Sequence, residues 1–291
     1  MTIGFIGLGN MGSAIAGRLK TGGQDLVVWN RSPGAAERMA AEPGVRRASA
    51  PAEALQGEVA FSMLADDAAV ESTLVSSGAL AAAAKGLVHV NCATVSVALA
   101  ERLEARHNEL GLAYVAAPVL GRPDAAAAGQ LHVLAAGAPA AVAKVQPLLA
   151  LMGQRVWPVG DRAAMANVVK LACNFALAST IETLGEAGAL AQAHGVEPTT
   201  LYAVMTGSLF ASPAMRVYAG LIGERRFEPA GFRLPLGLKD VRLALEAGEA
   251  RHTPLPLASL LRDHFLAAIA AGDADKDWSA VAMTAFRNAG L

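Results

Sequence analysis

Residues 3–12 read Ile-Gly-Phe-Ile-Gly-Leu-Gly-Asn-Met-Gly, and this stretch decides the fold. An apolar run opens into Gly7-x-Gly9-x-x-Gly12, and helical apolar spacing follows. The first glycine permits a tight turn after a strand, the second lets a pyrophosphate approach the backbone, and the third lets a helix pack against the strand. Free N–H groups and the helix dipole then favour phosphate at this turn. We therefore predict a dinucleotide site made by Gly7, Leu8, Gly9, Asn10, Met11 and Gly12. A purely structural glycine turn is the alternative.

The end of the next expected strand, residues 26–29, indicates which dinucleotide binds. NAD sites usually carry an acid there for the ribose 2′-hydroxyl, whereas this chain has Asn30-Arg31-Ser32. Arg31 offers a planar cation for a 2′-phosphate or the adenine ring, and Asn30 and Ser32 add neutral hydrogen-bonding groups. We predict NADP(H), with NAD possible; a surface arginine without this role is the alternative reading.

Composition limits the class of protein. The 291 residues are 54% apolar and 5% aromatic, which is typical of a helix-rich globular protein. The net charge of −1, with basic residues only in short clusters, does not favour binding to nucleic acid or to an anionic membrane surface. Cys92 and Cys173 form no CxxC pair, and the histidines show no metal-binding spacing. The chain shows neither a leader nor an apolar run long enough to span a bilayer, so we expect a cytoplasmic protein without a metal.

The hydrophobic pattern changes near residue 160. Before it, apolar strand-like runs alternate with helical stretches, which predicts βαβ units and a mostly parallel sheet. The expected strands are 59–64, 87–91, 112–117 and 131–136, and the expected helices are 68–75, 97–110 and 139–152. After it, a proline-free stretch from about 163 to 194 predicts one long helix, followed by further helices. We predict an α/β Rossmann domain over 1–160 and an all-α domain over 161–291, joined by the long helix.

Lys170 and Asn174 are four residues apart on that helix, so both face the same way. Hydride transfer to a carbonyl needs a proton donor, and burial lowers the pKa of an ammonium toward a useful range. Spacing alone leaves open a lysine that merely extends from the helix to solvent.

With these features the chain resembles the β-hydroxyacid dehydrogenases, the family of 3-hydroxyisobutyrate dehydrogenase and glyoxylate/succinic semialdehyde reductase. The resemblance covers nearly the whole chain. It rests on Gly4–Gly12, Ala117-Pro118-Val119-x-Gly121, Lys170-x-x-x-Asn174 and Leu238-Lys239-Asp240, in this order.

The resemblance implies further site residues. Lys170 would be the catalytic acid/base, Asn174 would help to bind substrate, and Thr94 would lie near the nicotinamide. Lys239 would contact the cofactor, with Asp240 orienting it. Met63 and Leu64 would pack beside a ribose of the cofactor.

The substrate loop departs from the family pattern Pro-Val-Ser-Gly-Gly. Here Leu120 replaces the serine, and Gly121 and Arg122 follow. Arg122 is a candidate partner for a substrate carboxylate, or it points to solvent; backbone N–H groups of 120–122 are the other candidates. The departure leaves open whether the substrate is an acid.

Taken together, the sequence predicts an NADPH-dependent reductase, or the reverse dehydrogenase, that acts on a small aldehyde, keto acid or β-hydroxy acid. An imine reductase and a non-catalytic NADP(H)-binding protein are the alternatives. Alanine-rich apolar helix faces favour a homodimer or homotetramer.

Overall fold

The computed structural model describes residues 2–291 and divides the chain into two compact units, the first ending at Lys170 and the second beginning at Leu171. The division falls inside helix α7 (Ala164–Ala193). Ala163, Ala164 and Ala166, at its start, pack in a core of the first unit. The helix therefore begins within the first unit, and the division at Lys170 lies ten residues beyond residue 160, where we predicted the boundary.

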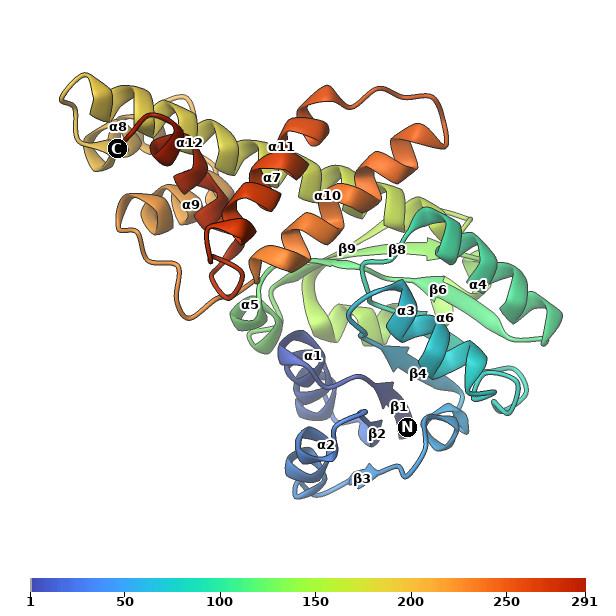
Figure 1. The fold of residues 1–291 in the computed structure, drawn as a ribbon. Coiled ribbons are helices and arrows are strands. Elements are labelled where there is room, and N and C mark those ends of the chain that lie inside the picture. The colour runs from blue at the N-terminus through green and yellow to red at the C-terminus, as the bar shows by residue number, and fades with distance from the viewer. Residues whose placement is uncertain (1) are drawn as a thin grey trace. The chain divides into compact units, whose positions relative to one another are not determined.

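The first unit is built on one sheet (Figure 1). Its strands are β1 (Thr2–Ile6), β2 (Asp25–Trp29), β3 (Val45–Arg47), β4 (Val59–Ser62), β5 (Val88–Asn91), β6 (Ala113–Ala116), β7 (Val119–Leu120), β8 (Leu131–Gly137) and β9 (Gly153–Gly160). The order is β3-β2-β1-β4-β5-β6-β8-β7, with β9 paired to β8. β1 to β6 pair in parallel, whereas β8 runs antiparallel to β6 and β7. The mostly parallel α/β fold that we predicted is confirmed.

Strand order reverses beside β1, which has β2 on one side and β4 on the other. The carboxyl ends of β1 and β4 therefore flank the point where open α/β sheets bind their ligands. The glycine turn leaves β1 at this edge, and residues Met63–Asp66 leave β4 beside it.

Helices cover both faces of this sheet because successive strand residues point to opposite sides. Phe5 packs in one core, together with α1 (Asn10–Thr21) and α6 (Pro139–Met152), whereas Ile6 packs in the other core, with α4 (Val97–Glu109). Each fully buried large apolar side chain contributes about 1.5–3 kcal/mol. The remaining α-helices of this unit are α2 (Pro33–Ala40), α3 (Asp67–Val70), which continues as a π-turn over Glu71–Ser76, and α5 (Pro123–Ala127). A 3₁₀-helix covers Pro51–Leu55.

The second unit is helical, as predicted. It contains the rest of α7, then α8 (Pro198–Gly207), α9 (Pro213–Gly223), α10 (Leu234–Glu249), α11 (Pro256–Ala270) and α12 (Met283–Asn288). Its core gathers around Phe265 and Trp278. Proline at the first turn of helices α8 to α11 starts each of them, because its missing N–H would have no helical partner there.

Helix α7 differs from the expectation that the chain contains no apolar stretch long enough to span a bilayer. It is long and apolar enough to cross a membrane by length and composition, with 44% of the most apolar window buried. A core helix passes the same test. Its apolar residues pack into a core of the first unit through Ala166 and into the core of the second through Ile181 and Leu184.

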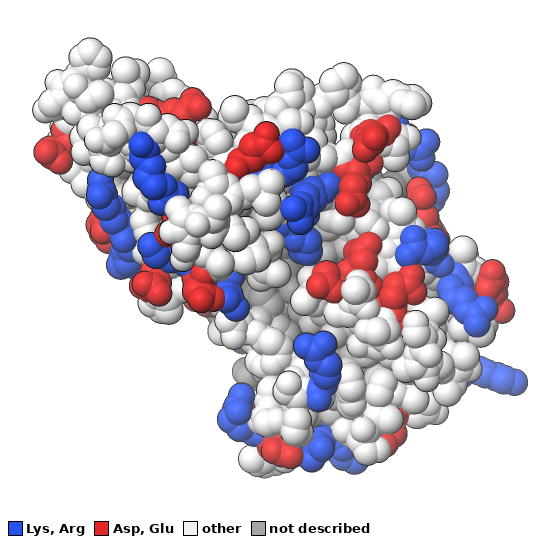
Figure 2. All heavy atoms as spheres, in the orientation of Figure 1, with Lys and Arg blue, Asp and Glu red and all other residues white. Residues whose placement is uncertain are grey.

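Charged side chains of both signs are interspersed on the face drawn in Figure 2, where blue and red groups alternate. Ion pairs between exposed side chains, such as Arg102–Glu71 and Arg47–Glu37, also occur in the first unit. No single-sign field of the kind that attracts nucleic acid covers this face.

Candidate active site

The glycine turn has the geometry that a phosphate-binding loop requires. Gly7 has φ +96°, and its N–H donates to Trp29 O at 2.9 Å. A Cβ at Gly7 would lie 2.3 Å from Met63 O, and one at Gly12 would lie 2.0 Å from Gly7 O. At Gly9, by contrast, no heavy atom of the described residues lies within 4 Å of an added Cβ. Space is therefore left beside Gly9, where α1 begins and its N–H groups are directed outward.

The side chain of Asn30 holds this turn in place. Its Oδ1 accepts from Leu8 N–H at 2.8 Å, and its Nδ2 donates to Ser32 O at 2.9 Å. The amide therefore joins the end of β2 to the glycine turn. Arg31 and Ser32 follow it as exposed residues at the same edge of the sheet. The sequence indicated Asn30 as a cofactor contact, and the structure adds this bracing role.

The loops after β4 and β5 are tied to the same edge. Met63 N–H donates to Ile6 O at 2.8 Å, and Cys92 N–H donates to Ser62 O at 2.8 Å. Asp66 caps α3 through Ala69 N–H. Met63 and Leu64 directly follow β4, and Thr94 follows the neighbouring strand β5. All three side chains are half-buried.

A buried polar network underlies these loops, and sequence reasoning missed it. Ser62 Oγ lies 2.8 Å from His89 Nε2, His89 Nδ1 lies 3.0 Å from His107 Nε2, and His107 Nδ1 lies 2.6 Å from Leu103 O. Since the carbonyl can only accept, His107 Nδ1 carries the proton. With both rings neutral, His89 Nδ1 then donates to His107 Nε2, and Ser62 Oγ donates to His89 Nε2.

Burial explains why neutral rings are favoured. It lowers the pKa of His89 well below its usual value and the pKa of His107 to about 4. Asn91 extends the network, because its Oδ1 lies 3.1 Å from Ser62 Oγ and also accepts from Ala93 N–H, while its Nδ2 donates to the Tyr114 hydroxyl. The sequence signal for this cluster was a histidine inside an apolar strand and another on the apolar face of α4.

Two carboxylates accept hydrogen bonds from backbone N–H and hydroxyl groups near the site. Asp67 accepts from Ser96 N–H at 2.9 Å and from Ser96 Oγ at 2.5 Å. Glu104 accepts from Ala163 N–H at 3.1 Å, just before α7 begins. Both contacts fix segments that lead to predicted site residues, Thr94 in one case and Lys170 in the other.

The predicted substrate loop is a short strand followed by a glycine turn. Leu120 pairs with His132 in β8 and is half-buried against the core that contains α4. Gly121 has φ +138°, and a Cβ there would lie 2.6 Å from Leu131 Cδ2. Arg122 follows, half-buried, at the start of α5. The loop's shape therefore depends on Gly121.

Lys170 is only 8% exposed on the second turn of α7. The half-buried Val169 beside it packs against the core of the first unit. One turn earlier, Asn167 is 1% exposed and donates from Nδ2 to Val95 O at 3.4 Å. This turn of α7 is therefore joined to the residue that follows Thr94.

In the second unit, the other predicted residues form one cluster. Asn174 Nδ2 donates to Asp240 Oδ2 at 2.5 Å, and Lys239 Nζ lies 3.0 Å from Asp240 Oδ1. Asp240 is 2% exposed and Asn174 is 5% exposed. Asp240 thus orients both the amide and the ammonium, whereas the sequence had indicated only the ammonium.

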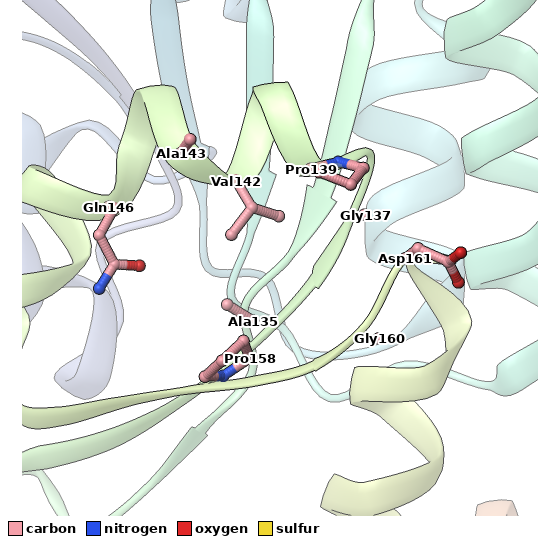
Figure 3. A pocket seen from close by; sticks show the side chains of 9 residues that line it. All are labelled: Ala135, Gly137, Pro139, Val142, Ala143, Gln146, Pro158, Gly160 and Asp161. Atoms are coloured by element: carbon pink, nitrogen blue, oxygen red, sulfur yellow. The ribbon is translucent and has the colours of Figure 1, made fainter.

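A cavity of about 350 Å³ lies between α6 and the strands β8 and β9 (Figure 3). Small apolar side chains line most of it, with Gln146 and Asp161 as polar groups. None of the predicted site residues lines this cavity. Among residues 2–291, no group of three or more His, Cys, Asp or Glu side chains has the arrangement of a metal site.

Comparison with known proteins agrees with this geometry. The family described as the NAD binding domain of 6-phosphogluconate dehydrogenase matches residues 2–160. The family described as the NAD-binding domain of NADP-dependent 3-hydroxyisobutyrate dehydrogenase matches residues 164–285. The fold and the glycine turn thus define a two-domain oxidoreductase that uses a nicotinamide cofactor.

Similar full-length proteins narrow the class. An uncharacterized oxidoreductase, YfjR, of Bacillus subtilis is 39% identical, covering 97% of this chain and 98% of that protein. The NAD-dependent L-serine dehydrogenase of Pseudomonas aeruginosa is 34% identical over 96% of each. The structure of Mycobacterium tuberculosis 3-hydroxyisobutyrate dehydrogenase with L-serine has a TM-score of 0.87 at 30% identity, covering 97% and 98% of the two chains. The chain belongs to the β-hydroxyacid dehydrogenase family, as the sequence resemblance indicated.

Proposed function

We propose that this protein is an NADPH-dependent oxidoreductase that interconverts a small aldehyde or keto acid and the corresponding hydroxy acid, with Lys170 as general acid/base. The observation that carries this proposal is the position of Lys170. It is 8% exposed, on a turn of α7 that belongs to the dinucleotide-binding unit. A buried ammonium there suits proton transfer beside a nicotinamide.

The residues of the first unit fit a dinucleotide. The open space at Gly9 and the N-terminus of α1 would hold the pyrophosphate. Arg31 and Ser32 would hold the 2′-phosphate, since no carboxylate stands at the end of β2 to repel it. Because one relative is described as NAD-dependent, NAD is the competing cofactor. Met63, Leu64 and Thr94 would line the path toward the nicotinamide.

The chemistry assigned to the chain is proton transfer and orientation. When bound, the cofactor supplies the hydride in the direction of reduction. Lys170 Nζ would give its proton to the carbonyl oxygen, and the neutral amine would take it back in the direction of oxidation. Asn174 would bind the substrate, and Lys239 would contact the cofactor. Asp240 would orient the side chains of Asn174 and Lys239.

The relatives' names and the loop at Leu120 support the proposed substrate class. Relatives are named for L-serine, glyoxylate, succinic semialdehyde and 3-hydroxyisobutyrate. These are small molecules with a carboxylate, and Arg122 or the N–H groups of Gly121 and its neighbours would bind that group. Leu120 makes one side of the site apolar, which would favour a substrate with a hydrophobic methyl or methylene group.

A cytoplasmic homodimer or homotetramer is part of the proposal. The second unit exposes large apolar side chains, among them Val204 (64%), Leu209 (94%) and Phe210 (51%). Large apolar side chains that are exposed in a single subunit are commonly buried against a partner subunit.

The test compares Lys170→Ala with Lys144→Ala, which removes a surface lysine paired with Glu58. With NADPH and a panel of small aldehydes, keto acids and cyclic imines, Lys170→Ala should lose at least about 100-fold in kcat. Its Kd for NADPH should change by less than about twofold, and Lys144→Ala should match the wild type. Wild-type turnover by Lys170→Ala would overturn the mechanism. Activity on cyclic imines alone would favour an imine reductase, and NADPH binding without turnover would favour a non-catalytic binding protein.

A further inference from the structure

A second cavity, of about 230 Å³, lies wholly within the second unit. The end of α7, the start of α8, the end of α9 and helix α12 surround it, and all four are labelled in Figure 1. Its lining includes Gln192, Glu197, Thr199, Ile222, Arg225 and Phe286. The residues that the sequence predicted for the active site take no part in this lining. Because cavities for drug-sized ligands measure about 300–1,000 Å³, this one suits a smaller molecule.

Arg225 occupies a backbone position where glycine is usually found. It follows the end of α9 with φ +49°. Its N–H donates to Ile222 O, and the N–H of Arg226 donates to Leu221 O, which is the left-handed cap that commonly ends a helix. A Cβ is crowded in this conformation, so glycine is favoured there. Residues that are held in such conformations cluster at ligand-binding sites.

The side chain of Arg225 lies against an aromatic ring of the cavity. Its guanidinium carbon is 5.8 Å from the centroid of the Phe286 ring, and Phe286 is buried. The face of the ring attracts the cation and limits where it can lie. The neighbouring Arg226 pairs with Glu224 at 2.9 Å. Within the described structure, by contrast, Arg225 forms no ion pair with Glu197, although both line the cavity.

The start of α8 supplies the opposite charge. Glu197 is the N-cap residue of α8, and its side chain accepts no capping hydrogen bond from the helix. Thr199 packs beside the end of α9, since a Cβ added at Gly223 would lie 3.2 Å from Thr199 Cγ2. Gln192 adds an amide from α7. The lining therefore contains one cation, one anion and two neutral hydrogen-bonding side chains, and the two charges do not neutralise each other by contact.

We propose that this cavity binds a small zwitterion, a free α- or β-amino acid. The carboxylate of the ligand pairs with the guanidinium of Arg225, whose planar fork matches it, and the ammonium of the ligand pairs with the carboxylate of Glu197. Thr199 and Gln192 supply neutral hydrogen bonds. A compound with only one of the two charges leaves one lining charge without a partner, so the cavity discriminates against it. The proposal is independent of the reaction that the protein catalyses.

The experiment measures binding to the full-length protein without NADPH by isothermal titration. L-Alanine and β-alanine are the zwitterions, propionate carries only the carboxylate, and ethylammonium carries only the ammonium. The better of the two zwitterions should bind at least about tenfold more tightly than either singly charged compound. Its Kd should rise at least about tenfold in Arg225→Gly and in Glu197→Gln. Arg226→Gln, which removes the neighbouring ion pair with Glu224, is the matched control and should bind like the wild type.

Arg225→Gly also separates binding from folding. Glycine suits the left-handed position, so this variant should melt at the wild-type temperature or higher while it loses affinity for the zwitterion. Lys170→Ala should keep the wild-type affinity, because the candidate active site is not the one tested. Equal affinity for propionate and L-alanine would indicate an anion site and overturn the proposal. No binding of either zwitterion at millimolar concentrations, or unchanged affinity in Arg225→Gly, would overturn it as well.

Discussion

His89 and His107 are fully buried and stacked, with ring centroids 5.0 Å apart and 3.0 Å between Nδ1 of the first and Nε2 of the second. One ring is on β5 and the other on α4, so the pair links the sheet to a helix beneath the loops that lead to Thr94. Ser62, at the end of β4, joins the same chain of contacts. Neutral histidines therefore brace the edge of the sheet where the cofactor is expected to bind.

This pair should make stability depend on pH. Because the pKa of His107 is about 4 in the folded protein and ordinary in the unfolded chain, the unfolded chain binds more protons between those values. Stability is then complete above about pH 6.5 and falls as the pH drops toward 4. For His107 alone, we expect a loss of about 1 kcal/mol between pH 7 and about 5.5.

Urea unfolding of the wild type and of His107→Gln at these two pH values checks this expectation. The variant should start less stable and should lose about 1 kcal/mol less on acidification. An equal loss in both proteins would show that His107 is not the group responsible.

The glycines of the first turn should separate folding from binding. A Cβ at Gly12 would collide with Gly7 O, so Gly12→Ala should lower the unfolding midpoint strongly. Gly9→Ala meets nothing within 4 Å among the described residues and should fold normally, but it should bind NADPH at least about tenfold more weakly because the methyl group occupies the space for the pyrophosphate. Isothermal titration and thermal melting measure the two effects. Unchanged NADPH affinity in Gly9→Ala would place the pyrophosphate elsewhere.

Cofactor preference should depend on Arg31. Arg31→Asp puts a carboxylate where the ribose 2′-group is expected, so kcat/KM for NADPH should fall at least about tenfold while that for NADH rises or stays level. Arg38→Asp, another exposed arginine, on α2, is the matched control. Steady-state kinetics with both cofactors decide the matter, and an unaltered preference in Arg31→Asp would count against NADP.

Removing the charge of Asp240 should lower the stability of the protein, because Asp240 pairs with Asn174 and Lys239 in the second unit. Asp240→Asn would set an NH₂ group or a neutral oxygen against Asn174 and remove the counterion of Lys239. We expect a loss of about 1–3 kcal/mol in unfolding free energy. The exposed control Asp263→Asn, which breaks a surface pair with Arg262, should change it by less than about 0.5 kcal/mol. Equal stabilities in a denaturant titration would mean that Asp240 orients neither partner.

The sequence by itself determined the α/β architecture, the glycine turn and the family. The turn is readable because Gly7 and Gly12 act over a few residues, where backbone sterics decide the outcome. The long helix was readable because its apolar spacing continues without proline. Lys170 was found only because four motifs occur in order, since one lysine on a helix has many explanations.

Tertiary structure alone decided which polar groups meet. Asn30 reaches Leu8 across 22 positions, Ser62 reaches His89 across 27, and Asn167 reaches Val95 across 72. No local pattern carries such pairings, because a hydrogen bond depends on an approach of about 3 Å between segments that the chain brings together only when the sheet and its helices are complete. Local spacing thus fixed the backbone elements, and the closing of the fold fixed the partners of their side chains.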